Sequence, residues 1–187
     1  MIDFDKLRKE VEDKLSDESS GRDYSHVMRV FKNAVIIAQS EDGVDMDTLK
    51  AACLLHDIAY SKKFYEIEYA KTSEDIAKKM LSEKDFNAER IEMILNIIRN
   101  HNIWVDFKTD VPIETKILRD ADRLDYLGHT GVVRGVAYAA FAKKNALKVL
   151  QHNLKLENEF ETDKGSELAK PRAKVLKDFI TGLEQEY

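Results

Sequence analysis

The residues best suited to chemistry in this sequence are two histidines and two aspartates, spread over about the first two thirds of the chain. His56 and Asp57 are adjacent at the end of the apolar run that includes Leu54, while His26 lies upstream and Asp122 downstream. An adjacent imidazole and carboxylate can both turn toward one cation near a helix end. The four side chains would supply a mixed nitrogen and oxygen ligand set, which indicates a divalent metal site.

The choice of Asp122 depends on how a helix would present residues 120–125. We predict a helix from 112 to 127 whose buried stripe contains Ile113, Ile117, Ala121 and Leu124. By i+3 and i+4 spacing its other face carries Arg119, Asp122, Asp125 and Tyr126. Asp120 points away from that face. The spacing therefore favours Asp122 and Asp125 over Asp120 for the site.

The segments around these residues resemble the HD-domain superfamily of metal-dependent phosphohydrolases. Residues 23–30 are similar to the first-histidine helix of that family, and residues 117–128 are similar to its last-aspartate helix. A Gly-x-x-Arg segment at residues 131–134 resembles the small, single-domain members. The resemblance implies an all-α fold, hydrolysis of a phosphoester or phosphoanhydride bond, and a metal ion held by His26, His56, Asp57 and Asp122.

The ligand types limit which metal would bind. The set contains no thiolate, which structural zinc sites commonly use, and it is too hard to prefer copper(I). We expect one divalent ion per chain, Mn²⁺, Fe²⁺, Co²⁺, Ni²⁺ or Mg²⁺, in a roughly octahedral site. The one cysteine, Cys53, lies within an apolar run and is expected to be a buried thiol.

Hydrolysis also needs cations for the phosphate charge and a group for proton transfer. For the charge we predict Arg29 and Arg123, together with Lys62 or Lys63. Arg29 and Arg123 could instead be salt-bridge partners of Asp125 and other acids, and the two lysines could be a solvated loop. The predicted catalytic residues are Asp57, His101 and Asp125. His101 and Asp125 are the candidates for proton transfer, although His101 could equally be a buried structural histidine.

The sequence departs from the resembling family in two places. Many relatives have an acidic residue a few positions after the His-Asp pair, whereas residues 58–63 here contain none. The general acid of those relatives therefore cannot be carried over. His129 stands where relatives more often have a small residue. We expect His129 and His152 to be surface or structural residues.

Length and composition predict one helical domain. A chain of 187 residues with 43% hydrophobic content can bury one sizeable core, and only seven glycines and two prolines favour helices over a sheet. We predict an all-α fold over residues 1–187, a core of about residues 22–130, terminal helices packed on it, and a metal site between central helices. The expected helices cover about residues 3–16, 23–38, 49–58, 65–82, 87–101, 112–127, 132–144, 146–157 and 171–186.

The charge balance and the N-terminus limit the partners. A net charge of −5 and a pI near 5.6 argue against a broad surface for a nucleic-acid polymer. The charged N-terminus and the lack of a long apolar segment predict a cytoplasmic protein that does not bind a membrane. Exposed apolar positions on the terminal helices could support a homodimer.

The function that the resemblance implies is hydrolysis of a small phosphorylated molecule, most reasonably a nucleotide. Removal of pyrophosphate or phosphate from a nucleoside triphosphate, or of phosphate from a monophosphate, is favoured over cleavage of a cyclic or polymeric substrate. One alternative is a metal-binding or nucleotide-binding sensor module without turnover. Another is a di-iron HD-type oxygenase, which would need additional ligands that only His101 and His129 could supply.

Overall fold

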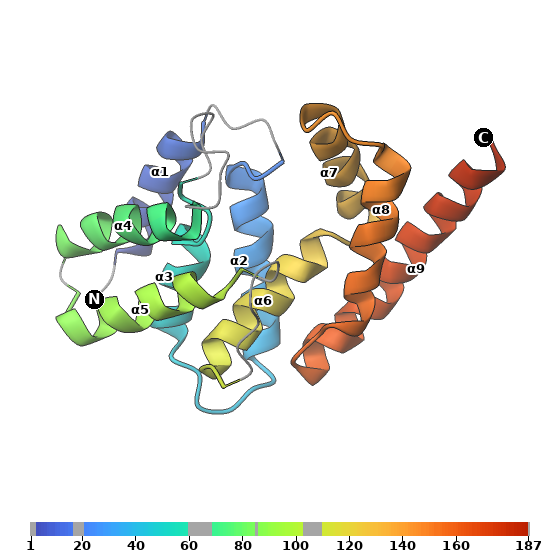
Figure 1. Ribbon diagram of the computed structural model, residues 1–187. Helices are drawn as coiled ribbons and strands as arrows, with labels where there is room; N and C mark the ends of the chain where they lie inside the picture. The colour runs from blue at the N-terminus through green and yellow to red at the C-terminus, as the bar shows by residue number, and fades with distance from the viewer. Residues whose placement is uncertain (1–2, 17–20, 60–68, 85, 103–109, 187) are drawn as a thin grey trace.

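The computed structural model describes residues 3–16, 21–59, 69–84, 86–102 and 110–186, and every regular element in these ranges is helical (Figure 1). This confirms the predicted all-α fold. Helices occur at α1 (Phe4–Leu15), α2 (Tyr24–Ala38), α3 (Met46–Leu55), α4 (Tyr69–Ser82), α5 (Ala88–Asn100), α6 (Ile113–Asp125), α7 (Gly128–Phe141), α8 (Ala146–Leu154) and α9 (Asp163–Gln185), with a short 3₁₀ helix at Lys155–Asn158. Within these residues, no helix is both long enough and apolar enough to span a membrane.

Short polar side chains define where most of these helices begin. The Asp23 side chain accepts a hydrogen bond from the His26 backbone N–H, and the Asp45 side chain accepts from the backbone N–H groups of Asp47 and Thr48. Such caps satisfy backbone donors that have no partner inside the helix. Helix α3 therefore begins directly after Asp45. These caps fix where α2 and α3 begin, and the start of α2 places His26 in the first turn of that helix.

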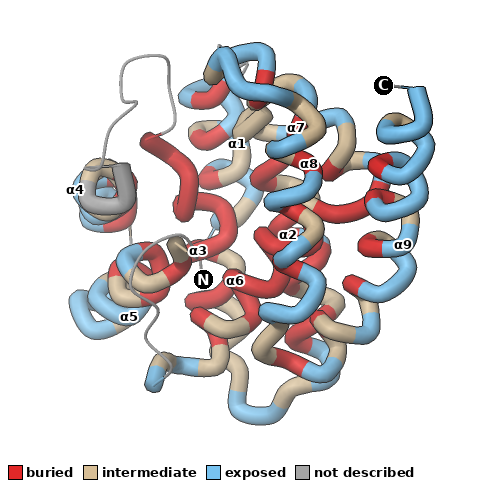
Figure 2. The backbone as a smooth tube through the Cα atoms, turned by 45° about the vertical axis from the view of Figure 1, so that its right-hand side comes forward, coloured by how far each residue is buried: buried red, intermediate tan, exposed pale blue. Residues whose placement is uncertain are grey.

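Helix α3 lies at the centre of the core, as the apolar run predicts. All residues from Thr48 to Leu55 except Lys50 are buried, and α2, α5 and α6 pack around the helix. Figure 2 shows buried backbone along most of α3 and α6. The Cys53 thiol is buried and burial raises its pKa, which agrees with an inert core cysteine. The C-terminal end of α3 therefore delivers His56 and Asp57 into the interior.

Helices α7, α8 and α9 pack on one another, and α7 and α9 also contact α6, so α6 joins this group to the helices before it (Figure 1). The turn from α6 into α7 is tight: a Cβ atom at Gly131 would lie only 2.2 Å from the Tyr126 carbonyl oxygen. Gly131 therefore permits the first turn of α7 to sit directly over the end of α6. That contact brings Arg134 back toward Asp125.

Two predicted helix starts are wrong. The last helix begins at Asp163, because the Thr162 hydroxyl caps it by accepting from the Gly165 N–H, and Pro171 lies inside the helix. Helix α7 begins at Gly128, where a φ of +69° suits glycine, rather than at Val132. The predicted start of the helix at residue 65 falls outside the described residues.

The face of α6 opposite the predicted site carries a buried ionic cluster. Asp120 accepts hydrogen bonds from the backbone N–H groups of Glu161 and Thr162 and from the Thr162 hydroxyl, at 2.8–3.0 Å. Arg123 Nη1 contacts both Asp120 (3.0 Å) and Glu161 (2.8 Å), and Arg119 Nη1 lies 3.2 Å from Glu161. This cluster ties the start of α9 to α6. Asp120 points away from the site, as predicted.

Candidate metal centre

Three buried side chains from three helices converge at one point. His26 comes from the first turn of α2, His56 follows the last residue of α3, and Asp122 comes from α6. One ligand atom of each lies within 4.8 Å of the other two. Because α2 packs on both α3 and α6, the core itself fixes these positions.

Hydrogen bonds orient both imidazoles with one ring nitrogen toward the point of convergence. His26 Nδ1 lies 2.7 Å from Asp125 Oδ2, and His56 Nδ1 lies 2.8 Å from the Cys53 carbonyl oxygen. We assign the proton to Nδ1 in each neutral ring, since a carboxylate and a carbonyl can only accept. Each Nε2 then presents a lone pair, the form in which histidine binds metals.

The inward-facing ligand atoms lack protein hydrogen-bond partners. Among the described residues, the buried atoms without a hydrogen bond include His26 Nε2, His56 Nε2 and Asp122 Oδ1. Buried polar atoms in folded proteins nearly always have a partner, because an unmade hydrogen bond costs about 1–3 kcal/mol. Three such atoms aimed at one point fit a bound cation.

The Asp57 carboxylate is the fourth group beside this set. Its Oδ2 lies 3.4 Å from His26 Nε2 and 3.7 Å from His56 Nε2. Burial alone would raise the pKa of the Asp57 carboxyl, but His56, Arg22 and His101 hold that pKa well below its usual range. The structure thus brings together all four residues predicted as metal ligands, and it keeps Asp57 ionised.

His101 stands beside this set at the end of α5. It is buried, its Nδ1 faces the Ile98 carbonyl oxygen, and its Nε2 lies 3.6 Å from Asp57 Oδ1. Burial opposes the charged imidazolium, yet the Asp57 carboxylate and the Ile98 carbonyl outweigh it and raise the pKa of His101. With Nδ1 donating to a carbonyl, Nε2 faces a carboxylate favourably only when it too carries a proton. His101 is thus buried and contacts a candidate ligand, whereas its predicted role in proton transfer stays a prediction.

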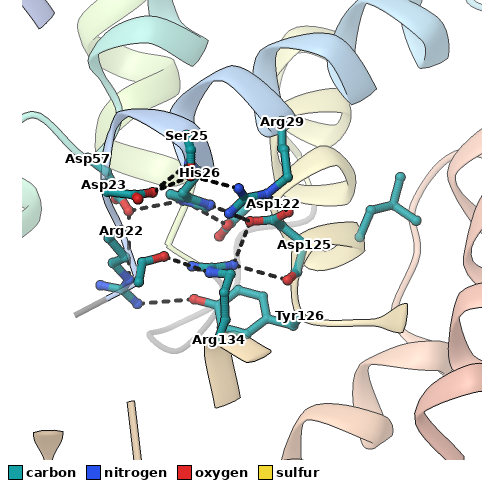
Figure 3. Close-up of polar contacts among 12 residues, drawn as sticks. Arg22, Asp23, Ser25, His26, Arg29, Asp57, Asp122, Asp125, Tyr126 and Arg134 are labelled. Atoms are coloured by element: carbon teal, nitrogen blue, oxygen red, sulfur yellow. Dashed lines mark hydrogen bonds and ion pairs between the residues drawn. The ribbon is translucent and has the colours of Figure 1, made fainter. Parts of the chain in front are cut away.

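Asp125 lies behind His26 and is fully engaged by positive groups. Arg29 donates to both of its oxygens, at 2.7 and 3.0 Å, and Arg134 Nη1 lies 2.9 Å from Oδ2, with Arg29 and Arg134 on either side of the carboxylate (Figure 3). Burial would raise the pKa of Asp125, but the bonds to His26 and Arg29 and the charge of Arg134 hold it far below its usual range. Asp125 therefore carries no proton to donate near neutral pH, which argues against its predicted role in proton transfer. Its geometry suits orientation of the His26 ring.

The structure separates the predicted phosphate-binding cations. Arg29 pairs with Asp125, the salt-bridge alternative considered for it, and Arg123 lies in the buried cluster with Asp120 and Glu161. The structure therefore does not bring Arg123 to the candidate site. Lys62 and Lys63 lie outside the described residues.

Two arginines and a tyrosine that the spacing argument did not assign to substrate are linked to one another, and one of them contacts the candidate ligand Asp57. Arg22 Nε lies 3.7 Å from Asp57 Oδ2, and Arg22 Nη2 donates to the Tyr126 hydroxyl at 3.1 Å (Figure 3). The Arg134 guanidinium stacks 4.7 Å from the centre of the Tyr126 ring and donates to the Gly21 carbonyl at 2.7 Å. Arg134 belongs to the Gly-x-x-Arg segment, which was the available signal for it.

A cavity of about 590 Å³ opens beside Arg22, between the start of α2 and helices α7 and α8. Its described lining carries four Lys or Arg side chains and no carboxylate: Arg22, Arg134, Lys144 and Lys148, with His152, Tyr126 and Tyr138 among the other residues. Lys148 and His152, which are four residues apart on α8, were the sequence signal for a basic face of that helix. His152 is exposed, as predicted, but it lines this cavity.

His129 is also exposed, as predicted, and it lies at the start of α7 away from the four converging ligands. The described residues thus add one histidine, His101, to the set. The di-iron alternative needs additional ligands, for which the sequence offered only His101 and His129, and of these two the structure brings only His101 into contact with a candidate ligand.

An all-helical fold with this order of histidine, histidine-aspartate and aspartate defines a class of protein. The model of the HD domain family matches residues 23–127, and the chain belongs to that family. Proteins of this family generally bind divalent metals and are generally metal-dependent phosphohydrolases.

Particular relatives resemble the chain over nearly its whole length. It is 28% identical to YpgQ of Bacillus subtilis, an alignment that covers 97% of this chain and 92% of that protein. The crystal structure of Bacillus subtilis YpgQ in complex with ADP matches with a TM-score of 0.78, covering 97% of this chain and 96% of the other. An HD-superfamily hydrolase from Bacillus thuringiensis is 26% identical, with a TM-score of 0.71 and coverage of 97% and 95%.

Proposed function

We propose that the protein is a metal-dependent phosphohydrolase whose substrate is a small phosphorylated molecule, most reasonably a nucleotide. The observation that carries the proposal is the set of three buried candidate ligand atoms without hydrogen bonds, on His26, His56 and Asp122. A purely structural cluster would satisfy such atoms with protein hydrogen bonds. Family membership supports the same reaction class.

The metal would be held by His26, His56, Asp57 and Asp122. Two neutral imidazoles and two carboxylates suit Mn²⁺, Fe²⁺, Co²⁺, Ni²⁺ or Mg²⁺, with room left for water or a phosphate oxygen. When bound, such an ion supplies a nucleophilic water near neutral pH and polarises a phosphoryl oxygen. The hydrogen bonds from His26 to Asp125 and from His56 to Cys53 keep both rings in the ligating orientation.

The substrate would lie in the cavity lined by α7 and α8, with its phosphates toward Arg22. Arg22 spans the Asp57 carboxylate and this cavity, so it is placed to bind a phosphoryl group next to the metal ligands. Lys144 and Lys148 extend the positive charge along the cavity, which suits a chain of phosphates, and Tyr138 offers a ring against which a base could stack. The complex of the similar YpgQ with ADP supports a nucleotide.

Proton transfer to the leaving oxygen is assigned to His101. This imidazole is buried beside Asp57 and has a raised pKa, so it holds a proton that could be donated. Asp57 would hold the imidazolium in place, as carboxylates commonly do for catalytic histidines. His101 thereby replaces the acidic residue that segment 58–63 lacks.

Product analysis tests this proposal. Metal-stripped protein, resupplied with Mn²⁺, is incubated with a panel of nucleoside mono-, di- and triphosphates, and released phosphate and pyrophosphate are separated by ion chromatography. Asp57→Ala serves as the blank, and Lys9→Ala, on the exposed face of α1, as a matched variant that should retain full activity.

Pyrophosphate or phosphate released by the unmutated protein and by Lys9→Ala, and absent from the blank, would establish the reaction and identify the bond cleaved. Nucleotide and metal binding without any product above the blank, across several metals, would instead favour a sensor module.

A further inference from the structure

A second groove lies on the far side of Asp125 from the metal ligands. It has a volume of about 550 Å³ and runs between α2, the start of α7 and α9. Three of its lining side chains are cationic, Arg29, Lys32 and Arg172, and His129 lies at its edge with α7. The only carboxylate in its described lining is Asp125, which Arg29 and Arg134 already engage. The groove is therefore positively charged.

Arg172 contributes a charge that its direct partners do not balance. Its Nη1 donates to the Leu124 carbonyl at 3.1 Å, and its Nη2 donates to the Asn33 side-chain oxygen at 3.0 Å. Both acceptors are neutral. Burial lowers the pKa of Arg172, and the more distant charge of Asp125 offsets this effect only in part. An anion placed in the groove would supply the compensating charge.

The start of α7 adds a second source of positive potential. Gly128, His129 and Thr130 line the groove, and this helix start has neither a side-chain cap nor an acidic residue in its first turn. Helices α2, α3, α5, α8 and α9 are each capped by the side chain that precedes them. An uncapped helix start carries about half a unit of positive charge and unsatisfied backbone donors.

We propose that this groove is a second anion site, separate from the substrate cavity, which binds a phosphate or pyrophosphate group through Arg29, Lys32, Arg172 and the start of α7. About a third of the Arg29 side chain (35%) is exposed, so its guanidinium can meet an anion while it holds Asp125. Anions in proteins commonly bind where arginines meet a helix start. Binding of an anion there does not require hydrolysis, and the contacts described for Arg29 and Arg172 include none of the candidate metal ligands.

Binding of inorganic pyrophosphate to the metal-free protein tests the proposal. The Lys148→Glu variant places a negative charge in the substrate cavity and should weaken pyrophosphate binding there. Pyrophosphate that this variant still binds is therefore attributed to the groove. Adding Lys32→Glu should weaken that binding by about tenfold, the loss of one charge-assisted contact. Adding Lys9→Glu, the same charge change on exposed α1, should weaken it by less than about twofold. Equal weakening by the two additions, or no binding to Lys148→Glu, would overturn the proposal.

A second measurement uses the protein without substitutions. Pyrophosphate should shift the imidazole proton resonances of His129, identified by their loss in His129→Gln, because this ring lines the groove and does not line the substrate cavity. A saturable shift supports the site. His129 resonances that stay in place while pyrophosphate binds would show that the anion occupies the substrate cavity alone.

Discussion

The two faces of helix α6 carry buried aspartates in opposite states. Asp120 accepts hydrogen bonds from two backbone N–H groups and a hydroxyl, and it pairs with Arg123. Asp122, two residues later, has a buried oxygen without a hydrogen bond, and this oxygen lies 3.6 Å from His26 Nε2, which also lacks one. The same residue type is thus satisfied by the fold on one face and left for a ligand on the other.

This contrast distinguishes a buried carboxylate that stabilises the fold from one that is available to a ligand. A buried carboxylate that the protein fully engages can hold two elements together, as Asp120 holds the start of α9 to α6. A buried carboxylate that the protein leaves unengaged costs stability, so its presence indicates a ligand that compensates it. The two faces should therefore respond differently to the same substitution.

The largest effect is expected from Asp122→Asn. It removes an ionised ligand, so Mn²⁺ binding by calorimetry and nucleotide hydrolysis should each fall by at least about a hundredfold, as even outer partners of metal ligands can contribute that much. The metal-free protein should be no less stable, because Asp122 Oδ1 has no hydrogen bond to lose. A variant that unfolds more easily yet still binds the metal would reverse the assignment of this face.

Asp120→Asn should give the converse result. The amide replaces one acceptor oxygen by a donor that faces the N–H groups of Glu161 and Thr162, so the free energy of unfolding should fall by about 2–3 kcal/mol. Denaturant unfolding measures this loss, and metal stoichiometry is the control. Loss of metal binding in the folded variant would show that the two faces are not separate.

The sequence alone predicted one of these faces well. The order and surroundings of His26, His56, Asp57 and Asp122 predicted four candidate ligands that the structure brings together, because each lies in a segment whose helix can be predicted locally. Arg123 was misplaced because each residue of a helix turns by about 100°, so a neighbour of Asp122 points elsewhere. Arg119, predicted on the Asp122 face, likewise bonds the Asn100 carbonyl and Glu161.

Other features required the tertiary structure. Arg22 reaches Asp57 only because the segment before α2 lies over the end of α3, and the cations at Lys144 and Lys148 reach the cavity only through packing of α8 on α7. The unpartnered state of Asp122 is a property of the folded interior and has no sequence signature. The start of α9 was missed because Pro171 was a stronger local signal than the Thr162 cap.

Acid titration sharpens the comparison between the faces. The folded-state pKa of Asp125 lies below its unfolded value, so its stabilisation is present above about pH 4 and is lost as the pH falls. Burial raises the pKa of Asp120, so acidification acts on that group in the opposite direction. The free energy of unfolding of the metal-free protein is measured between about pH 5 and pH 2. Over this range it should fall by about 2 kcal/mol less in Asp125→Asn than in the unmutated protein. The same scan on Asp120→Asn should show no such flattening.

The smallest effect is expected from Arg123→Lys, compared with Arg22→Lys. Arg123 bridges Asp120 and Glu161 on the structural face, so a lysine that contacts one acid at a time should lower the free energy of unfolding by about 1 kcal/mol and leave KM unchanged. Arg22 faces the cavity next to Asp57, so its replacement should raise KM about tenfold through loss of bidentate phosphate binding. A raised KM in Arg123→Lys would return that residue to the substrate site and make α6 functional on both faces.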